Sequence, residues 1–181
     1  MKEFKPVIIF LLKFILVWVG LLFFYNLYLD VYHTENLPDP YSRQVADWTV
    51  SCLNSIGYEV SAVDDKTRPW TWIYFEGDWA SYINEGCNAI SIMMIFVAFI
   101  VAFSTTWKQT SLYLIGGLIL IQIMNIFRIC LLNYIFKFHN EYGTMAHDYL
   151  FPAIIYGTIV ALWIVWVRFF VMKFQKQKSD E

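Results

Sequence analysis

The sequence predicts an all-α membrane protein, a four-transmembrane-helix bundle with an outer loop region that contains an amphipathic helix and a β-hairpin. The first observation is the composition: of 181 residues, 59% are hydrophobic, 20% aromatic and only 15% charged, with a mean hydropathy of +0.50. A chain of this size cannot bury so much apolar surface in its own core. The second observation is that the apolar residues form long uncharged runs. A net charge of -2 offers no basic surface for nucleic acid.

Four segments are long and apolar enough to cross a bilayer. About 20 helical residues span the roughly 30 Å hydrocarbon core. The first segment contains a single charge, Lys13, which lies near one end and can extend its ammonium to the headgroups. Lys108 separates the second segment from the third, and Arg128 is the only charge in the third. The expected spans are residues 6–29, about 87–107, about 110–136 and about 148–170.

Basic residues indicate which span ends face the cytoplasm, because Lys and Arg flanks are retained on that side. The basic flanks are Lys2, Lys5, Lys108, Arg168, Lys173, Lys176 and Lys178. The segment from Asp30 to Glu85 is acidic in balance, with Arg43, Lys66 and Arg68 as its basic residues. We therefore expect a multi-pass protein of the cell (inner) membrane with both termini in the cytoplasm. A cleaved signal peptide is the alternative for the N-terminus, but no small-x-small site follows Leu29.

This topology divides the chain into four parts. They are the first span with its cytoplasmic N-terminus (1–29), a periplasmic loop region (30–86), a three-helix core (87–172) and a basic cytoplasmic tail (173–181).

The periplasmic region is long enough to need structure of its own. Asp39 followed by proline is typical of a helix start, and apolar residues then recur at helical spacing up to Gly57: Tyr41, Val45, Trp48, Cys52 and Ile56. Residues 58–63 and 70–75 favour strands, and the turn-forming residues 64–67 between them predict a hairpin. Four aromatic residues here either form a belt at the headgroups or line a groove for an extended substrate. They are Trp70, Trp72, Trp79 and Tyr82.

A polar stripe runs along one face of the third span. Gln122, Asn125 and Arg128 recur every three residues, so they share a face that must turn into the bundle, because lipid cannot satisfy their hydrogen bonds. A charge at this depth costs at least about 2.5 kcal/mol on insertion scales and therefore has a purpose. The alternative to a functional role is an arginine that pairs with helix-end carbonyls.

Cys87 lies where the acidic loop meets the second span. A thiol near the N-terminus of a helix is favoured as the thiolate, which is the nucleophilic form. The alternative is a small buried hydrophobic residue, and this is the interpretation that we give to Cys52 and Cys130. His147 precedes the fourth span, where a neutral imidazole can accept a proton, although an interfacial histidine is otherwise solvated or capping. No ligand pair has metal-site spacing, so we expect no metal and no cofactor.

The predicted topology brings three of these residues to one face of the bundle. The second and fourth spans begin outside and the third ends outside, so Cys87, Arg128 and His147 converge there. A thiol, a base and a fixed cation are the groups that acyl transfer requires.

Three short motifs resemble those of the exosortase and archaeosortase family of membrane cysteine transpeptidases, and especially its short exosortase F-type branch from Bacteroidetes. They are Glu-Gly-Cys-Asn-Ala at residues 85–89, Asn-Ile-Phe-Arg-Ile at residues 125–129, and His147. The resemblance covers residues 85–170. Many members of the family follow the cysteine with Ser or Thr and then Gly, where this chain has Asn88 and Ala89.

The resemblance implies a cysteine peptidase or transpeptidase. Its expected substrates are exported proteins with a C-terminal sorting signal, which consists of a short motif, a transmembrane helix and a basic tail. Cys87 is then the nucleophile, His147 the general acid and base, and Arg128 the group that supports the transition state, with Asn125 orienting Arg128 through its amide. The acceptor that resolves the thioester is a glycan, a lipid or water.

Two other classes of function remain open from the sequence. A membrane thiol oxidase would use a disulfide between Cys52 and Cys87, although the chain has no Cys-x-x-Cys pair. A non-enzymatic membrane assembly factor would use the polar stripe to bind a partner helix.

Overall fold

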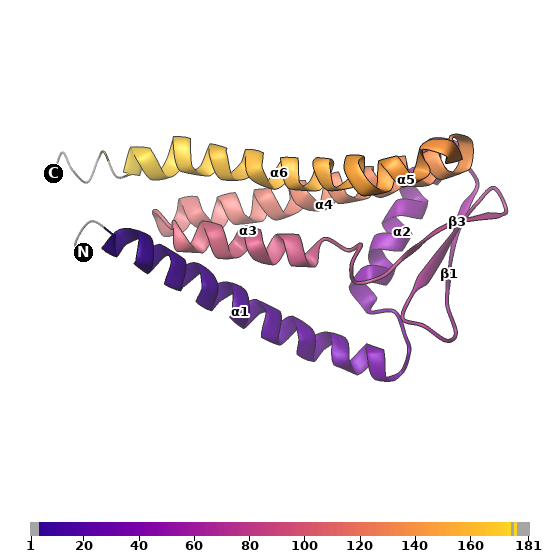
Figure 1. Ribbon diagram of the computed structural model, residues 1–181, viewed down its shortest axis with the longest axis horizontal. Helices are drawn as coiled ribbons and strands as arrows, with labels where there is room; N and C mark the ends of the chain where they lie inside the picture. The colour runs from indigo at the N-terminus through magenta and orange to yellow at the C-terminus, as the bar shows by residue number, and fades with distance from the viewer. Residues whose placement is uncertain (1–3, 175, 177–181) are drawn as a thin grey trace.

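The structure, a computed structural model, describes residues 4–174 and 176. Long helices run side by side, and a short helix and a small sheet cover one end of this bundle (Figure 1). Both chain ends lie at the opposite end of the bundle, away from the sheet (Figure 1). The predicted tail, residues 173–181, falls largely outside the described residues.

Three helical segments in the described part of the chain are long and apolar enough to cross a membrane. They are α1 (Lys5–Thr34), α4 (Trp107–Phe138) and a composite segment, Asn140–Phe174. The composite segment begins with a 3-10 turn (Asn140–Tyr142), α5 (Gly143–Met145) and a π-helical turn (Ala146–Leu150), continues as α6 (Phe151–Trp166) and includes a second π-helical turn (Val167–Val171). The protein is therefore a mostly helical membrane protein.

The segment predicted as the second span is shorter than expected. It forms α3, which runs from Ile90 to Ala102 and has 13 residues. Ala89 adopts a left-handed conformation with φ of 65°, so the chain turns there and the helix begins only at Ile90. The α3 helix ends at Ala102 because Phe103 leaves the helical region of φ and ψ. By length, α3 is not a full membrane span like the other three.

The interior of the bundle lies between α3, α4 and α6. Phe96, Ile121, Ile155 and Trp166 are almost completely buried there. The α3 and α4 helices approach closely because Gly117 has no side chain: a Cβ at this position would lie 2.3 Å from the Phe96 ring. The α1 helix packs on α3 and leaves most of its own surface exposed, as a lipid-facing helix does.

The outer helix α2 (Pro40–Ser55) begins at the predicted place. The Asp39 carboxylate caps it, accepting hydrogen bonds from the backbone N–H groups of Tyr41 and Ser42 at 3.1 and 3.0 Å. The buried face differs from the predicted apolar stripe. It consists of Ser42, Val45, Ala46, Thr49 and Leu53. Small polar residues can be buried here because their hydroxyls are hydrogen-bonded within the protein, as the Thr49 hydroxyl is to the Val45 carbonyl at 2.9 Å.

The sheet has three antiparallel strands in the order β1-β2-β3 where the sequence predicted a two-stranded hairpin. The strands are β1 (Val60–Asp64), β2 (Thr71–Phe75) and β3 (Asp78–Ile83). One face buries Ile73, Phe75 and Ile83 against α2 and α4. The β2–β3 turn is fixed to the end of α4 by Lys137, whose ammonium lies 2.9 Å from the Asp78 carboxylate. This attachment holds β3 against α4.

Candidate active site

Cys87 lies in a tight turn between β3 and α3, fixed by two neighbouring asparagines. The backbone N–H of Cys87 donates to the Asn84 carbonyl at 2.9 Å, and the Asn84 side chain accepts from the N–H of Gly86 at 3.0 Å. On the other side, the Asn88 side chain accepts from the N–H of Ile90 at 2.9 Å and so caps α3. The same Asn88 amide is fully buried and donates to Tyr25 and Ser42, which ties the turn to α1 and α2.

Asn125 fixes the same turn from across the bundle. Its side-chain amide donates to the carbonyl of Cys87 at 3.0 Å, and the residue is completely buried. The resemblance implied instead that this amide orients Arg128. In the structure the Asn125 amide contacts the carbonyl of Cys87 and not Arg128, because the turn that carries Cys87 packs against α4 at this point. Asn125 is therefore placed to position the cysteine.

His147 lies further inside a helix than the sequence predicted. It belongs to the π-helical turn Ala146–Leu150, where the N–H of Phe151 donates to the Ala146 carbonyl five residues back. Pro152 follows this turn and has no N–H to donate to the Asp148 carbonyl, which favours a widened turn at this point. Such turns are frequent at functional sites because they redirect side chains.

The imidazole of His147 has two contacts that sequence reasoning missed. Its Nδ1 lies 3.0 Å from the Asp148 carboxylate, and its ring stacks on Phe151 with centroids 5.8 Å apart. The His147 side chain is 60% exposed. With Nδ1 donating to Asp148, Nε2 is the nitrogen that accepts a proton. Their positions in the sequence could have identified both residues, since Asp148 is adjacent to His147 and Phe151 lies one helical turn after it.

Arg128 is buried beneath the site, with 8% of its surface exposed. The centre of its guanidinium lies 4.3 Å from the centroid of the Phe151 ring, in the geometry of a cation–π contact. Its Nε has no hydrogen-bond partner among residues 4–174 and 176. Arg128 also lines a cavity of about 210 Å³ together with Gly86, the residue before the cysteine. The polar stripe of the third span thus faces inward at Asn125 and Arg128, as its spacing indicated.

Cys87 and His147 line one pocket, of about 510 Å³. Strand β3 forms one wall with residues 79–84, and the end of α4, Asn140 and Phe151 form the other. Arg128 does not line this pocket but contacts it through Phe151. The structure therefore brings the thiol and the imidazole into one cavity and places the cation next to it.

Burial raises the pKa of the Cys87 thiol above its usual value. A hydrogen bond between the thiol and the backbone of Asn84 and the positive charge of Arg128 both lower this pKa. Their combined effect is smaller than that of burial. The expectation that a helix start favours the thiolate is thus wrong here. The reason is structural: α3 begins three residues after Cys87, and the Asn88 side chain already occupies the first free N–H of that helix, at Ile90. A raised pKa favours the protonated thiol over the thiolate, so a base beside Cys87 would assist its attack.

We expect replacement of Arg128 by alanine to raise the pKa of Cys87 further, because the positive charge of Arg128 favours the thiolate. Less thiolate is then present at any pH below the new pKa, so alkylation by iodoacetamide slows and its pH profile moves to higher pH. The measurement is the rate of Cys87 alkylation against pH by mass spectrometry. Arg128→Lys retains the charge and is the control. Identical profiles for the Ala and Lys variants would show that the charge has no effect on the thiol.

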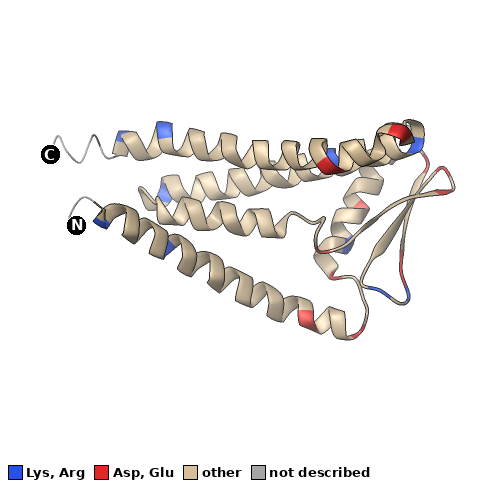
Figure 2. Ribbon diagram, viewed as in Figure 1, with Lys and Arg blue, Asp and Glu red and all other residues tan. Residues whose placement is uncertain are grey.

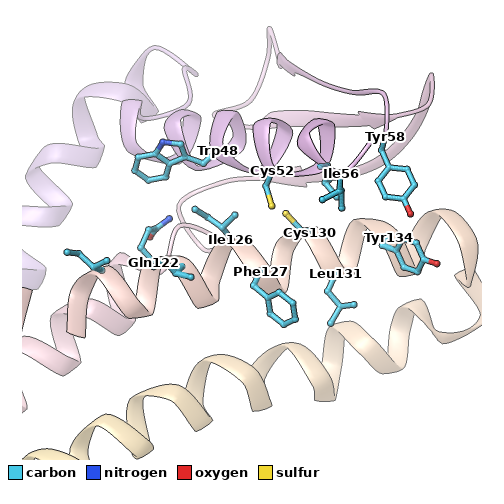
Figure 3. Close-up of a pocket in the computed structure, with 13 residues that line it drawn as sticks. Trp48, Cys52, Ile56, Tyr58, Gln122, Ile126, Phe127, Cys130, Leu131 and Tyr134 are labelled. Carbon is cyan, nitrogen blue, oxygen red and sulfur yellow. The ribbon is translucent and has the colours of Figure 1, made fainter. Parts of the chain in front are cut away.

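A larger cavity than the pocket of Cys87 and His147 lies elsewhere. It is a groove of about 1070 Å³ between α2 and α4, lined almost entirely by apolar side chains. Cys52 and Cys130 point toward one another across it (Figure 3). Cys52 is exposed to this groove, contrary to the packing role expected from the sequence, whereas Cys130 is buried. Cys52 and Cys87 line different cavities, so the disulfide that the thiol-oxidase alternative requires is not favoured by this arrangement.

A family model described as transmembrane exosortase matches residues 9–171, which is most of the chain. The match includes α1 and the outer region as well as residues 85–170, where the three motifs lie. No curated protein and no solved structure matches the chain.

Proposed function

Because this chain belongs to the transmembrane exosortase family, we propose that it is a cysteine peptidase or transpeptidase that cleaves the C-terminal sorting signals of exported proteins. The observation that carries this proposal is the pocket shared by Cys87 and His147. Arg128 supports it from the adjoining cavity, in contact with the Phe151 ring on which His147 stacks. A nucleophile, a base and a cation are thus assembled at one end of the bundle.

The distribution of charge supports a site on the outer face of the cell membrane. At the end of the bundle where both termini lie, the coloured residues are basic, whereas the acidic residues lie toward the end that carries the sheet, together with several basic ones (Figure 2). Basic flanks are retained in the cytoplasm. This orientation places the turn of Cys87 and the π-helical turn of His147 outside, where exported proteins are.

In the proposed first step, His147 removes the thiol proton through Nε2 while Asp148 holds Nδ1–H. The Cys87 sulfur then attacks the carbonyl carbon of the scissile peptide bond, and a tetrahedral intermediate with a negative oxygen forms. His147 returns the proton to the leaving amine as the C–N bond breaks. The product is a thioester between Cys87 and the exported protein, and the sorting signal leaves with a new amino terminus.

The second step resolves the thioester with water or with a hydroxyl or amine of an acceptor. His147 takes the acceptor's proton and returns it to the departing sulfur, so the enzyme is regenerated. Arg128 acts on both steps through its charge, which favours the negative sulfur over the neutral thiol. Hydrolysis and transpeptidation use the same residues and differ only in the acceptor.

Labelling of intact cells tests the site and its orientation together. The protein carries Cys52→Ala and Cys130→Ala, so that Cys87 is the remaining cysteine, and the reagent is a membrane-impermeant methanethiosulfonate. We expect Cys87 to be labelled from outside and His147→Ala to slow the labelling, because the base is missing. Gln109→Cys in a Cys87→Ala background is the matched control at the opposite end of the bundle and should remain unlabelled. Labelling of position 109 but not of Cys87 would reverse the orientation and refute an outer site.

A further inference from the structure

Strand β3 has a free edge beside the cysteine. In the sheet order β1-β2-β3, β3 pairs only with β2. Apart from that ladder, no main-chain group of residues 79–83 is hydrogen-bonded to other backbone within the described part of the chain. Alternate residues of a strand direct their N–H and C=O groups to its two sides. The strand is bulged at Ala80, because Ser81 pairs with Ile73 and Trp79 pairs with the next residue, Tyr74. On both sides of this bulge, the outer edge of β3 presents unpaired main-chain groups. Edges of this kind pair readily with another extended chain.

The pocket of Cys87 runs along this edge. It is lined by six consecutive residues of β3 and the following turn, residues 79–84. Successive side chains of a strand point to opposite faces, so a cavity that touches all of them borders the edge and not one face. The opposite wall is apolar, with Ile129, Leu132 and Phe136 of α4. The space between the two walls is a slot with main-chain groups on one side and apolar side chains on the other.

The slot leads to the catalytic pair. Cys87 follows the last residue of the β3 wall, Asn84, by three positions, and His147 and Phe151 lie in the same pocket. On the outer face of the sheet, Trp79 and Tyr82 line the pocket as well, and Tyr82 stacks on Trp70 at 4.4 Å between centroids. Ring contacts join the four aromatic residues of this region into one aromatic cluster, which borders the slot through Trp79 and Tyr82: Trp70, Trp72, Trp79 and Tyr82. Trp79 and Tyr82 share this face, although they are three residues apart, because of the bulge at Ala80, and both rings offer surface to side chains of a bound strand.

We propose that the segment of the substrate around the scissile bond binds as an additional β-strand on the free edge of β3. The main chain of this polypeptide pairs with β3, alternate side chains lie against the aromatic cluster and the α4 wall, and the pairing carries the scissile carbonyl to Cys87. This inference rests on the proposed function and adds the conformation in which the substrate is recognised. It also defines the substrate class: an extended segment with a free N–H at every second position.

Peptide chloromethyl ketones test this pairing on the full chain. The probe is a mixture of capped pentapeptides with randomised side chains and a C-terminal chloromethyl ketone. The Cys87 sulfur displaces chloride and forms a thioether, which mass spectrometry locates and quantifies. Five further mixtures each carry one N-methylated amide, which removes one N–H and leaves the side chains random. Iodoacetamide measures the reactivity of Cys87 without a peptide, and alkylation of the exposed Cys52 by the same probes is the internal control.

We expect the unmethylated mixture to alkylate Cys87 faster than iodoacetamide does, relative to Cys52. N-methylation should then slow the reaction about tenfold at every second amide and leave the amides between them unaffected, since only alternate N–H groups face β3. Equal effects at all positions, or at none, would overturn the strand pairing while leaving the nucleophile in place. A Cys87 that reacts with neither reagent would overturn the proposed function and this inference together.

Discussion

Replacement of Cys87 by serine is expected to abolish processing of the host's exported proteins that end in a spanning helix and a basic tail. A hydroxyl is a much weaker nucleophile than a thiol at neutral pH. Loss of the nucleophile from a set of cooperating catalytic residues lowers the rate by a factor on the order of 10⁴–10⁶. The measurement is mapping of C-terminal peptides by mass spectrometry. The processed C-termini should disappear, and full-length chains with their apolar helix should accumulate in the membrane.

Cys52→Ser is the matched control for this experiment. Cys52 is exposed in the groove between α2 and α4 and does not line the pocket of Cys87 and His147, so processing should continue unchanged. The control also separates the peptidase from a thiol oxidase, since an oxidase requires both cysteines. Normal processing with serine at position 87 would refute the assignment of the nucleophile.

Asn88→Ala is expected to have the largest effect on stability. The Asn88 side chain joins three elements: it donates to Tyr25 of α1 and Ser42 of α2 and caps α3 at Ile90, each at 2.9 Å. Alanine removes all three contacts at a completely buried position, and it leaves the buried Ser42 hydroxyl and the part-buried Tyr25 hydroxyl and Ile90 N–H without this partner. At about 1–3 kcal/mol for each buried group left unpaired, we expect a loss of roughly 3 kcal/mol in the free energy of unfolding.

Thermal unfolding of the purified protein, followed by the loss of its helical circular dichroism, measures this loss. Tyr25→Phe removes one of the three contacts and serves as the graded control, with an expected loss of about 1 kcal/mol. An Asn88→Ala variant that unfolds at the wild-type temperature would contradict the role given to this side chain. The adjacent Cys87 should also react faster in the alanine variant, since its turn is less firmly held.

The elements that could be predicted from the sequence are those fixed by local chemistry. Asp39 followed by proline marks the start of α2 because a carboxylate caps the helix and proline lacks only an N–H that has no partner there. Asn125 and Arg128 face inward because lipid cannot satisfy them. The convergence of Cys87 and His147 follows from the order of the helices, and the structure brings both into one pocket.

Other features depend on contacts that no local pattern reveals. The left-handed conformation of Ala89 shortens α3, and alanine gives no signal of it because the conformation is rare for this residue. Strand β3 contains weak strand formers such as Asp78 and Ser81, and it is fixed by contacts distant in sequence, among them the hydrogen bond of Ser81 with Asn133 of α4 at 2.8 Å. The buried face of α2 could not be predicted for a similar reason: Ser42 and Thr49 are buried there only because their hydroxyls have hydrogen-bond partners within the protein.

The limited length of α3 has a consequence for the membrane around the cysteine. A helix of 13 residues extends over only about 20 Å, whereas the hydrocarbon core is about 30 Å thick. Such hydrophobic mismatch is relieved when the bilayer thins locally or water enters above the helix. If the bilayer thins at the end of α3 where Ala89 and the turn of Cys87 lie, the membrane surface is brought closer to the Cys87 sulfur. Under the proposed function, the scissile bond of a substrate then reaches the sulfur without being lifted far from the bilayer, and we expect the rate of cleavage to depend on the thickness of the membrane.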